Sequence, residues 1–211
     1  MTRTVAVIQA RTGSNRLPGK VLEPLHDDVS LLAYQCRHLR RIDGVDELVI
    51  ATTTNPDDDA VVALAEREGI RAFRGSEEDV LSRFLLVADR TDARTLVRIT
   101  SDSPFRDPQV IASCVAGHVA ETADYTRPSA DHLPKGLRAE VVETAILRQL
   151  DTAPETTLRD REHVTVFIRD HLDRFRCHTV DFPEALRRPD FDVSVDTIED
   201  LALVRALYNA L

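Results

Sequence analysis

The sequence predicts an α/β protein with three layers, α/β/α, around a mostly parallel β-sheet. Short apolar runs rich in β-branched residues alternate with longer segments whose apolar residues recur at helical spacing. Polar loops follow several of the runs directly, as ligand-binding loops do at the carboxyl edge of a parallel sheet. The 211 residues, 43% of them hydrophobic, suffice for a sizeable core, so we expect residues 1–211 to form a single domain.

The strands are predicted where apolar runs are short and carry β-branched or aromatic side chains. The first run, V-A-V-I, is almost continuously apolar, which is typical of a strand covered on both faces. The predicted strands are residues 5–8, 47–52, 70–73, 95–99, 123–127, 138–142, 175–182 and 193–196.

The helices are predicted between these strands, most of them from a capping signal. Ser30 begins one that runs to about residue 41, and three aspartates at 57–59 occupy the first turn of another, where the macrodipole favours anions. Gly69 ends that second helix. Further helices are expected over 79–89, from Pro108 onward, over 157–171, and from Thr197 to the last leucines.

Composition favours a cytoplasmic protein that binds a small anion. The formal net charge is −9, whereas nucleic-acid binders usually carry a basic patch, so we expect no nucleic-acid partner. The three cysteines Cys36, Cys114 and Cys177 show no C-x-x-C spacing, which disfavours a disulfide scaffold or a zinc site. No signal peptide or long apolar span is visible, and we expect no membrane partner.

A polar loop follows the first strand at once and concentrates positive charge. It contains two glycines, a proline and three cations: Gly13, Gly19, Pro18, Arg11, Arg16 and Lys20. Glycines let backbone N–H groups approach phosphate oxygens, and arginine grips such oxygens bidentately. The spacing matches neither the Walker loop nor the dinucleotide fingerprint. The loop is therefore predicted to hold a phosphate group in a different way, the alternative being a basic surface loop.

Asp102 follows the predicted strand 95–99 and stands where a carboxylate can hold Mg²⁺, a cation that prefers oxygen ligands. Its alternative role is a helix cap, but Asp107 and Pro108 already supply that signal. Asp196 likewise follows a predicted strand, while Thr197 and Asp200 form the next cap. We therefore expect neither Asp102 nor Asp196 to have a structural task.

The loop Q-A-R-T-G-S-N-R-L-P-G-K resembles the signature loop of the CTP-dependent sugar-acid cytidylyltransferases, most nearly their spore-coat polysaccharide branch. That superfamily includes the synthetases that activate 3-deoxy-manno-octulosonate and N-acetylneuraminate. The resemblance extends through T-S-D-S-P, where the family usually shows G-D-x-P and Ser101 replaces the glycine, and through P-K-G-L-R-A-E-V, R-E-H and V-D-T-I-E-D-L. It implies the nucleotide-diphospho-sugar transferase fold, with a substrate and dimerisation arm near residues 125–182.

The resemblance also implies roles for individual residues. Arg11, Arg16 and Lys20 would be catalytic by neutralising the triphosphate. The nucleotide would contact Ala10, Arg11, Gly13, Ser14, Arg16, Lys20, Thr52, Arg74, Ser76, Asp79, Arg83 and Asp102. Arg83 has a solvated helix arginine as its alternative. The acceptor would meet Lys135, Arg138, Glu140, Glu162 and His163, for which exposed charges or a structural histidine are the alternatives. Mg²⁺ would be held by Asp102 and Asp196, with Asp192 as a weaker candidate.

The activity implied is transfer of CMP from CTP to a sugar or sugar-acid-like acceptor, with release of pyrophosphate, by a homodimer. Three alternatives stay open. The enzyme could use another nucleoside triphosphate with a sugar phosphate or phosphonate acceptor. The chain could instead be a glycosyltransferase, or a non-catalytic nucleotide binder, on the same fold. The residues do not identify the acceptor.

Overall fold

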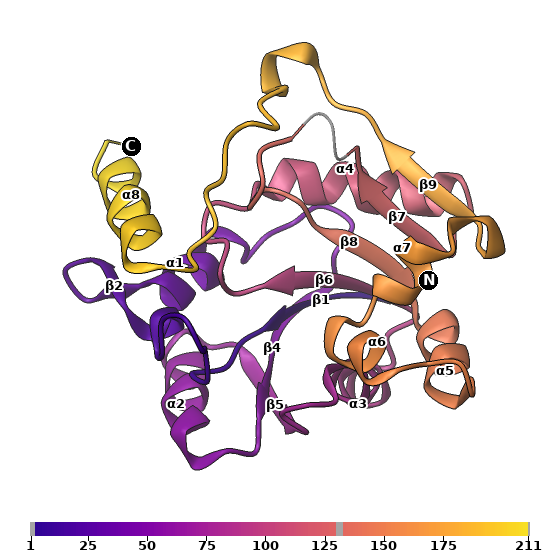
Figure 1. Cartoon of the computed structure of the whole chain (residues 1–211), viewed down its shortest axis with the longest axis horizontal. Helices are drawn as coiled ribbons and strands as arrows, with labels where there is room; N and C mark the ends of the chain where they lie inside the picture. The colour runs from indigo at the N-terminus through magenta and orange to yellow at the C-terminus, as the bar shows by residue number, and fades with distance from the viewer. Residues whose placement is uncertain (1–2, 130–132, 211) are drawn as a thin grey trace.

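A seven-stranded sheet forms the centre of the protein in the computed structural model, which describes residues 3–129 and 133–210 (Figure 1). Its strands are β1 (Thr4–Gln9), β4 (Glu47–Thr53), β5 (Arg71–Gly75), β6 (Thr95–Thr100), β7 (Tyr125–Pro128), β8 (Glu140–Glu143) and β9 (Cys177–Val180). They lie in the order β5-β4-β1-β6-β8-β7-β9. Only β8 runs antiparallel to its neighbours in this sheet, so the predicted α/β class with a mostly parallel sheet is confirmed.

Helices cover both faces of the sheet. One face packs against α1 (Leu31–His38), α2 (Asp59–Arg67) and α4 (Pro108–Ala120). The other packs against α3 (Val80–Thr91), α5 (Thr144–Thr152) and α7 (Val166–Asp170), with α6 (Leu158–His163) beside α3. The last helix, α8 (Ile198–Tyr208), lies beside the small hairpin of β2 (Pro24–His26) and β3 (Val29–Ser30) (Figure 1). Short 3₁₀ turns span Lys20–Leu22, Pro56–Asp58, Leu172–Arg174 and Glu184–Leu186.

The two layers of helices explain the continuous apolar run of β1. Ala6 and Ile8 enter the core beneath α1, α2 and α4, whereas Val5 and Val7 enter the core beneath α3, α5 and α7. All four side chains are fully buried. A strand in this position has no solvent face, so it does not alternate between apolar and polar residues. The site loop begins where this buried strand ends.

The predicted helix boundaries hold where a local cap defines them. The Ser30 hydroxyl accepts a hydrogen bond from the Ala33 N–H, and the Asp107 carboxylate accepts one from the Gln109 N–H. Thr197 and Asp200 form a reciprocal capping box at α8. Gly69 has φ = 66° after α2, a conformation that glycine adopts without steric cost.

The predicted strand over 193–196 is wrong, because the segment joins no ladder. It is extended, and a lone bridge links Lys135 to Asp192. The Val193 N–H donates to the Lys135 carbonyl at 3.0 Å, and the Val195 N–H donates to the Asp102 carbonyl at 2.7 Å. These partners belong to two different segments, so no run of paired residues can build up. The segment nevertheless lies against the end of β6, which brings Asp196 toward the site.

The single helix predicted over 157–171 is also wrong. It divides into α6 and α7 at Val164, whose φ of 58° and ψ of −57° are strained for a β-branched residue. The Val164 side chain is 1% exposed, and the Thr165 hydroxyl donates to Glu140 at 2.9 Å. We infer that this burial and hydrogen bond outweigh the strain. Such tertiary contacts have no signal in the local helical pattern.

The described part of the chain contains no helix with both the length and the apolar composition that a membrane crossing requires. The three cysteines are free thiols, with Cys36 and Cys114 buried and Cys177 exposed. Burial raises the pKa of both Cys36 and Cys114 to about 12, so these two thiols stay protonated at neutral pH.

Candidate active site

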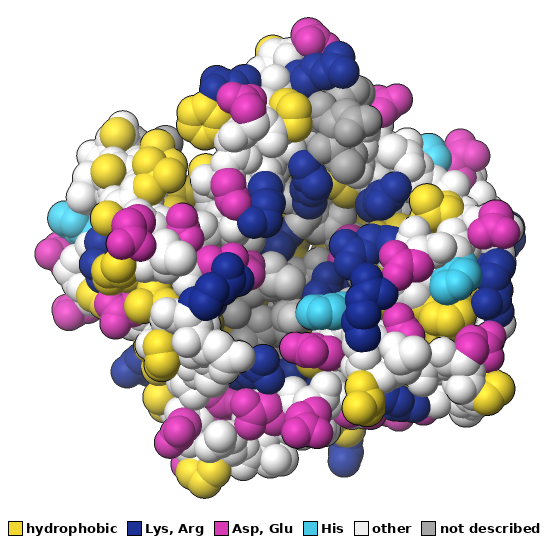
Figure 2. Space-filling model, in the orientation of Figure 1, with side chains coloured by type: hydrophobic (Ala, Val, Ile, Leu, Met, Phe, Trp, Pro, Cys, Tyr) yellow, Lys and Arg dark blue, Asp and Glu magenta, His cyan; other side chains and the backbone are white. Residues whose placement is uncertain are grey.

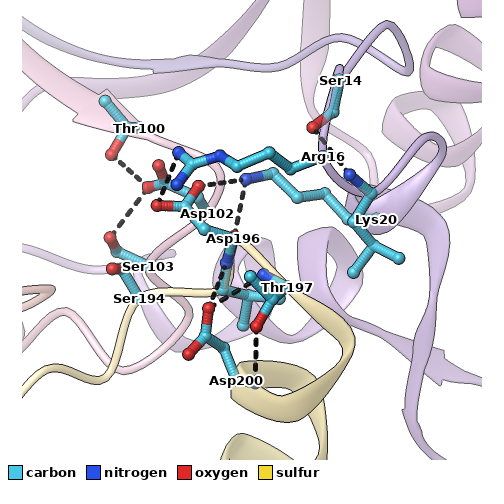
Figure 3. Close-up of polar contacts among 12 residues, drawn as sticks. Ser14, Arg16, Lys20, Thr100, Asp102, Ser103, Ser194, Asp196, Thr197 and Asp200 are labelled. Carbon is cyan, nitrogen blue, oxygen red and sulfur yellow. Dashed lines mark hydrogen bonds and ion pairs between the residues drawn. The ribbon is translucent and has the colours of Figure 1, made fainter.

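The polar loop after β1, the carboxyl end of β6 and the segment before α8 enclose a cavity of about 330 Å³, here called the loop cavity. Figure 3 shows Arg16 and Lys20 reaching from the loop toward Asp102 and Asp196. The predicted residues that line it are Ala10, Arg11, Gly13, Ser14, Arg16, Lys20, Arg83, Asp102, Glu162, His163 and Asp196. The space-filling view shows a hollow near the centre of this face with lysine and arginine side chains around it (Figure 2).

The base of the loop is held by Asp58, a residue whose sequence context indicated only a first-turn acid. Its carboxylate accepts hydrogen bonds from the Thr12 N–H and hydroxyl, both at 2.7 Å, and from the N–H and hydroxyl of Thr53. Burial alone would raise the pKa of Asp58, but these four hydrogen bonds outweigh it and lower the pKa. Asp58 thus ties the loop to the end of β4.

Gly19 lets the loop close on itself, and Gly13 lies against the side chain of Glu77. Gly19 has φ = 72°, and its N–H donates to the Thr12 carbonyl at 2.9 Å. At Gly13 a Cβ atom would lie 2.9 Å from the Glu77 carboxylate, too close without a shift of that side chain. Arg11 donates to the Glu77 carbonyl at 3.3 Å, so the loop also contacts the turn before α3.

Asp196 is held by two of the three cations of the loop. Lys20 Nζ lies 2.9 Å from one carboxylate oxygen of Asp196, and Arg16 Nη2 lies 2.9 Å from the other (Figure 3). Lys20 also donates to the Val195 carbonyl at 2.6 Å. The expectation that Asp196 has no structural task is therefore wrong. The cations lie 176 and 180 positions earlier in the chain, and no local pattern reports such a contact.

Asp102 is also engaged. Its carboxylate accepts hydrogen bonds from the Thr100 hydroxyl at 2.6 Å and the Ser103 hydroxyl at 2.8 Å. Burial raises the pKa of Asp102, but these hydrogen bonds and the charges of Arg106 and Lys20 lower it by more. The carboxylate is therefore ionised at neutral pH, and the expectation that Asp102 has no structural task is wrong as well, because it joins Thr100 to Ser103.

Arg83 projects from α3 into the loop cavity and is only 3% exposed. This excludes the alternative of a solvated helix arginine. Burial, assisted by the charge of Arg11, lowers the pKa of Arg83 to about 10, so its guanidinium is still charged at neutral pH. Its Nη1 donates to the Ala51 carbonyl at 3.4 Å, while its Nε has no hydrogen-bond partner among the described residues.

A second cavity of about 230 Å³ adjoins the loop cavity and shares Thr100, Asp102 and Asp196 with it. Three predicted acceptor residues line this second cavity: Lys135, Arg138 and Glu140. The other two, Glu162 and His163, line the loop cavity from the last turn of α6. The acceptor residues are therefore divided between two adjoining spaces.

Four predicted nucleotide contacts lie outside the loop cavity. Ser76 lines a recess on the outer side of the loop. Thr52 is buried within β4, and Arg74 donates to the Thr53 carbonyl and pairs with Asp59. Asp79 caps α3 and pairs with Arg161 at 2.7 Å. Their roles toward a nucleotide stay predictions.

Some lining residues were not predicted from the sequence. Gln9 and Thr100 end β1 and β6, so the rule that ligands bind at carboxyl ends of parallel strands could have found them. Arg106 lines the second cavity from the loop before α4. Nothing in the local sequence distinguishes it from an exposed loop arginine.

The carboxylate oxygens at this site fit a hard divalent cation that a substrate also coordinates. Asp102 and Asp196 present carboxylate oxygens to the same cavity, and oxygen is what Mg²⁺ prefers. Within residues 3–129 and 133–210, no three His, Cys, Asp or Glu side chains converge as a ligand set. A cation here would therefore take its remaining ligands from phosphate and water, as Mg²⁺ commonly does.

With this fold and cavity established, comparison with known proteins defines the class. The sequence pattern of the family described as Cytidylyltransferase matches residues 5–210, and the chain belongs to that family. It is 36% identical over 212 aligned positions to the spore coat polysaccharide biosynthesis protein SpsF of Bacillus subtilis. That alignment covers 99% of this chain and 88% of the relative.

Solved structures share the fold. A cytidylyltransferase from Leptospira borgpetersenii superposes with a TM-score of 0.92 at 24% identity, covering 100% of this chain and 88% of that one. A CMP:2-keto-3-deoxy-manno-octonic acid synthetase complexed with CTP gives 0.76 at 18% identity, with 99% of each chain covered. Rv0371C of Mycobacterium tuberculosis, solved in complex with manganese, gives 0.66 at 16% identity over 97% and 99%. At these identities the likeness concerns the fold alone.

Proposed function

We propose that this chain transfers CMP from CTP to a small acceptor and releases pyrophosphate. The proposal rests on one observation above all. Three loop cations, Arg11, Arg16 and Lys20, and two strand-end carboxylates, Asp102 and Asp196, line one cavity. This combination suits a triphosphate, whose charge needs cations, together with a metal ion, which needs oxygen ligands. Membership of the cytidylyltransferase family supports cytidine as the base.

The proposed reaction needs no covalent enzyme intermediate. An acceptor oxygen attacks the α-phosphorus of CTP, and the bond between that phosphorus and the pyrophosphate oxygen breaks. Arg11, Arg16 and Lys20 neutralise the triphosphate and the leaving pyrophosphate, so catalysis consists of positioning and electrostatic stabilisation. Mg²⁺, held by Asp102 and Asp196, would supply further charge neutralisation at the reacting phosphate.

The acceptor would occupy the second cavity. Lys135, Arg138 and Glu140 line it, and it meets the loop cavity at Asp102 and Asp196, so an acceptor oxygen there can approach the nucleotide. Glu162 and His163 would contact the acceptor from the loop cavity. The spore-coat relative supports an acceptor used in polysaccharide biosynthesis.

The test measures pyrophosphate release and thermal stabilisation with CTP, UTP, ATP and GTP in the presence of Mg²⁺. CTP should stabilise the protein most and should support release with a panel of sugar-acid, sugar-phosphate and phosphonate acceptors. Lys20→Ala should lower kcat/KM by about tenfold or more, because a charged hydrogen bond to phosphate contributes about 1.5–3 kcal/mol. Preferential stabilisation by ATP or GTP would contradict a cytidylyltransferase. Binding without release from any pair would favour a glycosyltransferase or a non-catalytic binder.

A further inference from the structure

The second cavity is strongly cationic within an acidic protein. Six cationic side chains line it: Arg98, Arg106, Arg127, Lys135, Arg138 and Arg169. Three carboxylates line it as well, Asp102, Glu140 and Asp196, and a fourth, Asp192, pairs with Lys135 at 2.6 Å, so among the described residues the formal excess is two positive charges. The whole chain carries a formal charge of −9. A charge of opposite sign gathered around about 230 Å³ indicates a space shaped for an anion.

Arg106 is buried at this cavity, and part of its guanidinium has no hydrogen-bond partner among the described residues. Its side chain is 5% exposed, and its Nη2 donates to the Thr100 hydroxyl at 2.6 Å. Its Nε and Nη1 are buried and have no hydrogen-bond partner within the described residues. Burial lowers the pKa of Arg106 to about 10, so it still carries its charge at neutral pH. A buried guanidinium with two unused donors is costly unless a ligand completes it.

The carboxylates that line the second cavity do not accept hydrogen bonds from Nε and Nη1 of Arg106. Glu140 is engaged by Arg98 at 2.6 Å, by Thr165 and by Tyr125. Asp196 is engaged by the loop cations, as described above. Asp102 contributes an attractive charge to Arg106, but its hydrogen bonds come from Thr100 and Ser103.

We propose that the second cavity binds a phosphate or phosphonate dianion carried by the acceptor, and that Arg106 is its principal contact. This proposal deepens the proposed function. Its statement that the anion belongs to the acceptor rests on that function. A tetrahedral dianion offers three oxygens to donors from several directions, whereas one carboxylate is satisfied by a single arginine fork. The number of cations around the cavity therefore favours the dianion. Because Arg106 bonds Thr100, which also bonds Asp102, the anion lies beside the junction with the loop cavity.

The first experiment uses the wild-type protein with saturating CTP and EDTA, so that the loop is occupied and no turnover occurs. Thermal unfolding is followed against inorganic phosphate, methylphosphonate and acetate at matched ionic strength. Phosphate and methylphosphonate should raise the unfolding midpoint, and acetate should have no effect beyond that of NaCl. Equal stabilisation by acetate would overturn the dianion and favour a carboxylate acceptor.

The second experiment compares variants by the same titration. Arg106→Met should lower the apparent affinity for phosphate by about tenfold or more. Its midpoint without anions should equal or exceed that of the wild type, because a buried guanidinium with two unpartnered donors is removed. Arg106→Lys should retain part of the phosphate effect. Arg148→Gln, which removes the same charge from an exposed site on α5 paired with Asp89, should retain all of it.

Two outcomes would overturn the role of Arg106. One is a wild-type phosphate response in Arg106→Met. The other is a combination of two results: Arg106→Met loses much of its stability in the absence of anions, and Arg106→Lys responds to phosphate as the wild type does. Together these results would show that Arg106 has a structural role. The proposed function fails separately, when CTP gives neither stabilisation nor pyrophosphate release in the wild type. In that case a phosphate response lost in Arg106→Met would still establish the anion site.

Discussion

Asp196 is shared by two cations that the proposed function assigns to a triphosphate. Lys20 and Arg16 each lie 2.9 Å from it. A bound triphosphate would therefore compete with Asp196 for the same donors. Once those donors turn to phosphate, the Asp196 carboxylate needs another cation, which is the condition under which a metal ion would bind. Asp102 is not in this competition, because its partners are hydroxyl groups.

This difference gives a prediction about the two aspartates. Without metal, Asp196→Asn should bind CTP about two- to fivefold more tightly than the wild type, since partly exposed ion pairs contribute up to about 1 kcal/mol. Asp102→Asn should bind metal-free CTP as the wild type does. Both variants should lose most Mg²⁺-dependent turnover, because an amide removes a negative ligand at nearly constant shape. Calorimetry in EDTA and pyrophosphate release against Mg²⁺ concentration measure the two effects. A wild-type metal curve in either variant would remove that aspartate from the ligand set.

At the scale of elements, the site loop depends on its tie to β4. Asp58→Ala should destabilise the protein by about 2–4 kcal/mol, because it leaves the half-buried donors of Thr12 and the buried donors of Thr53 without their acceptor. CTP affinity should fall with it, since the base of the loop is released. Urea unfolding and CTP titration check both effects. The control is Asp57→Ala at the exposed neighbouring position, where a change within about 0.5 kcal/mol is expected. Equal losses in the two variants would show that Asp58 has no special role.

Glu140, at the start of strand β8, is expected to make a pH-dependent contribution to the stability of the fold. Burial raises its pKa, but Arg98, Tyr125 and Arg169 outweigh burial and lower it below the ordinary value of 4.5. A depressed pKa in the folded state stabilises the protein above the ordinary value, and the contribution is lost as the pH falls below it. Glu140→Gln should therefore cost about 3–5 kcal/mol at neutral pH, because Arg98 loses its buried partner. The difference from the wild type should shrink below pH 4.5. Urea unfolding across a pH series measures it, and a difference that stays constant would contradict the assignment.

At the scale of the whole molecule, a large apolar side chain is exposed in residues 125–182, the segment expected to mediate dimerisation. Leu158, on α6 within residues 125–182, is 83% exposed. We predict a homodimer in solution, and Leu158→Glu should raise its dissociation constant by burying a charge in the interface. Light scattering over a dilution series measures the mass. Leu203→Glu, on α8 outside that segment and at a residue 46% exposed, is the control that should leave the dimer intact. A monomer mass for the wild type at micromolar concentrations would refute the prediction.

The sequence by itself determined the features that depend on near neighbours. The apolar run of β1 required a strand covered on both faces, and both faces are covered. Ser30, Asp107 and Thr197 cap their helices within three residues, so their roles were legible in the chain. The loop motif was legible for the same reason, since its glycines and cations lie within ten positions.

Only the tertiary structure decided which distant groups meet. Asp58 looked like a first-turn acid and holds Thr12, 46 positions away. Val164 lies in a helical pattern, yet burial of its side chain and the hydrogen bond from Thr165 to Glu140 accompany a break there. Asp196 looked free and is paired with cations from the other end of the chain, and Arg106 looked like a loop arginine and is buried against a cavity. The physical reason is common to all four. Burial and charge pairing depend on the whole fold, whereas caps and periodicity depend on a few consecutive residues.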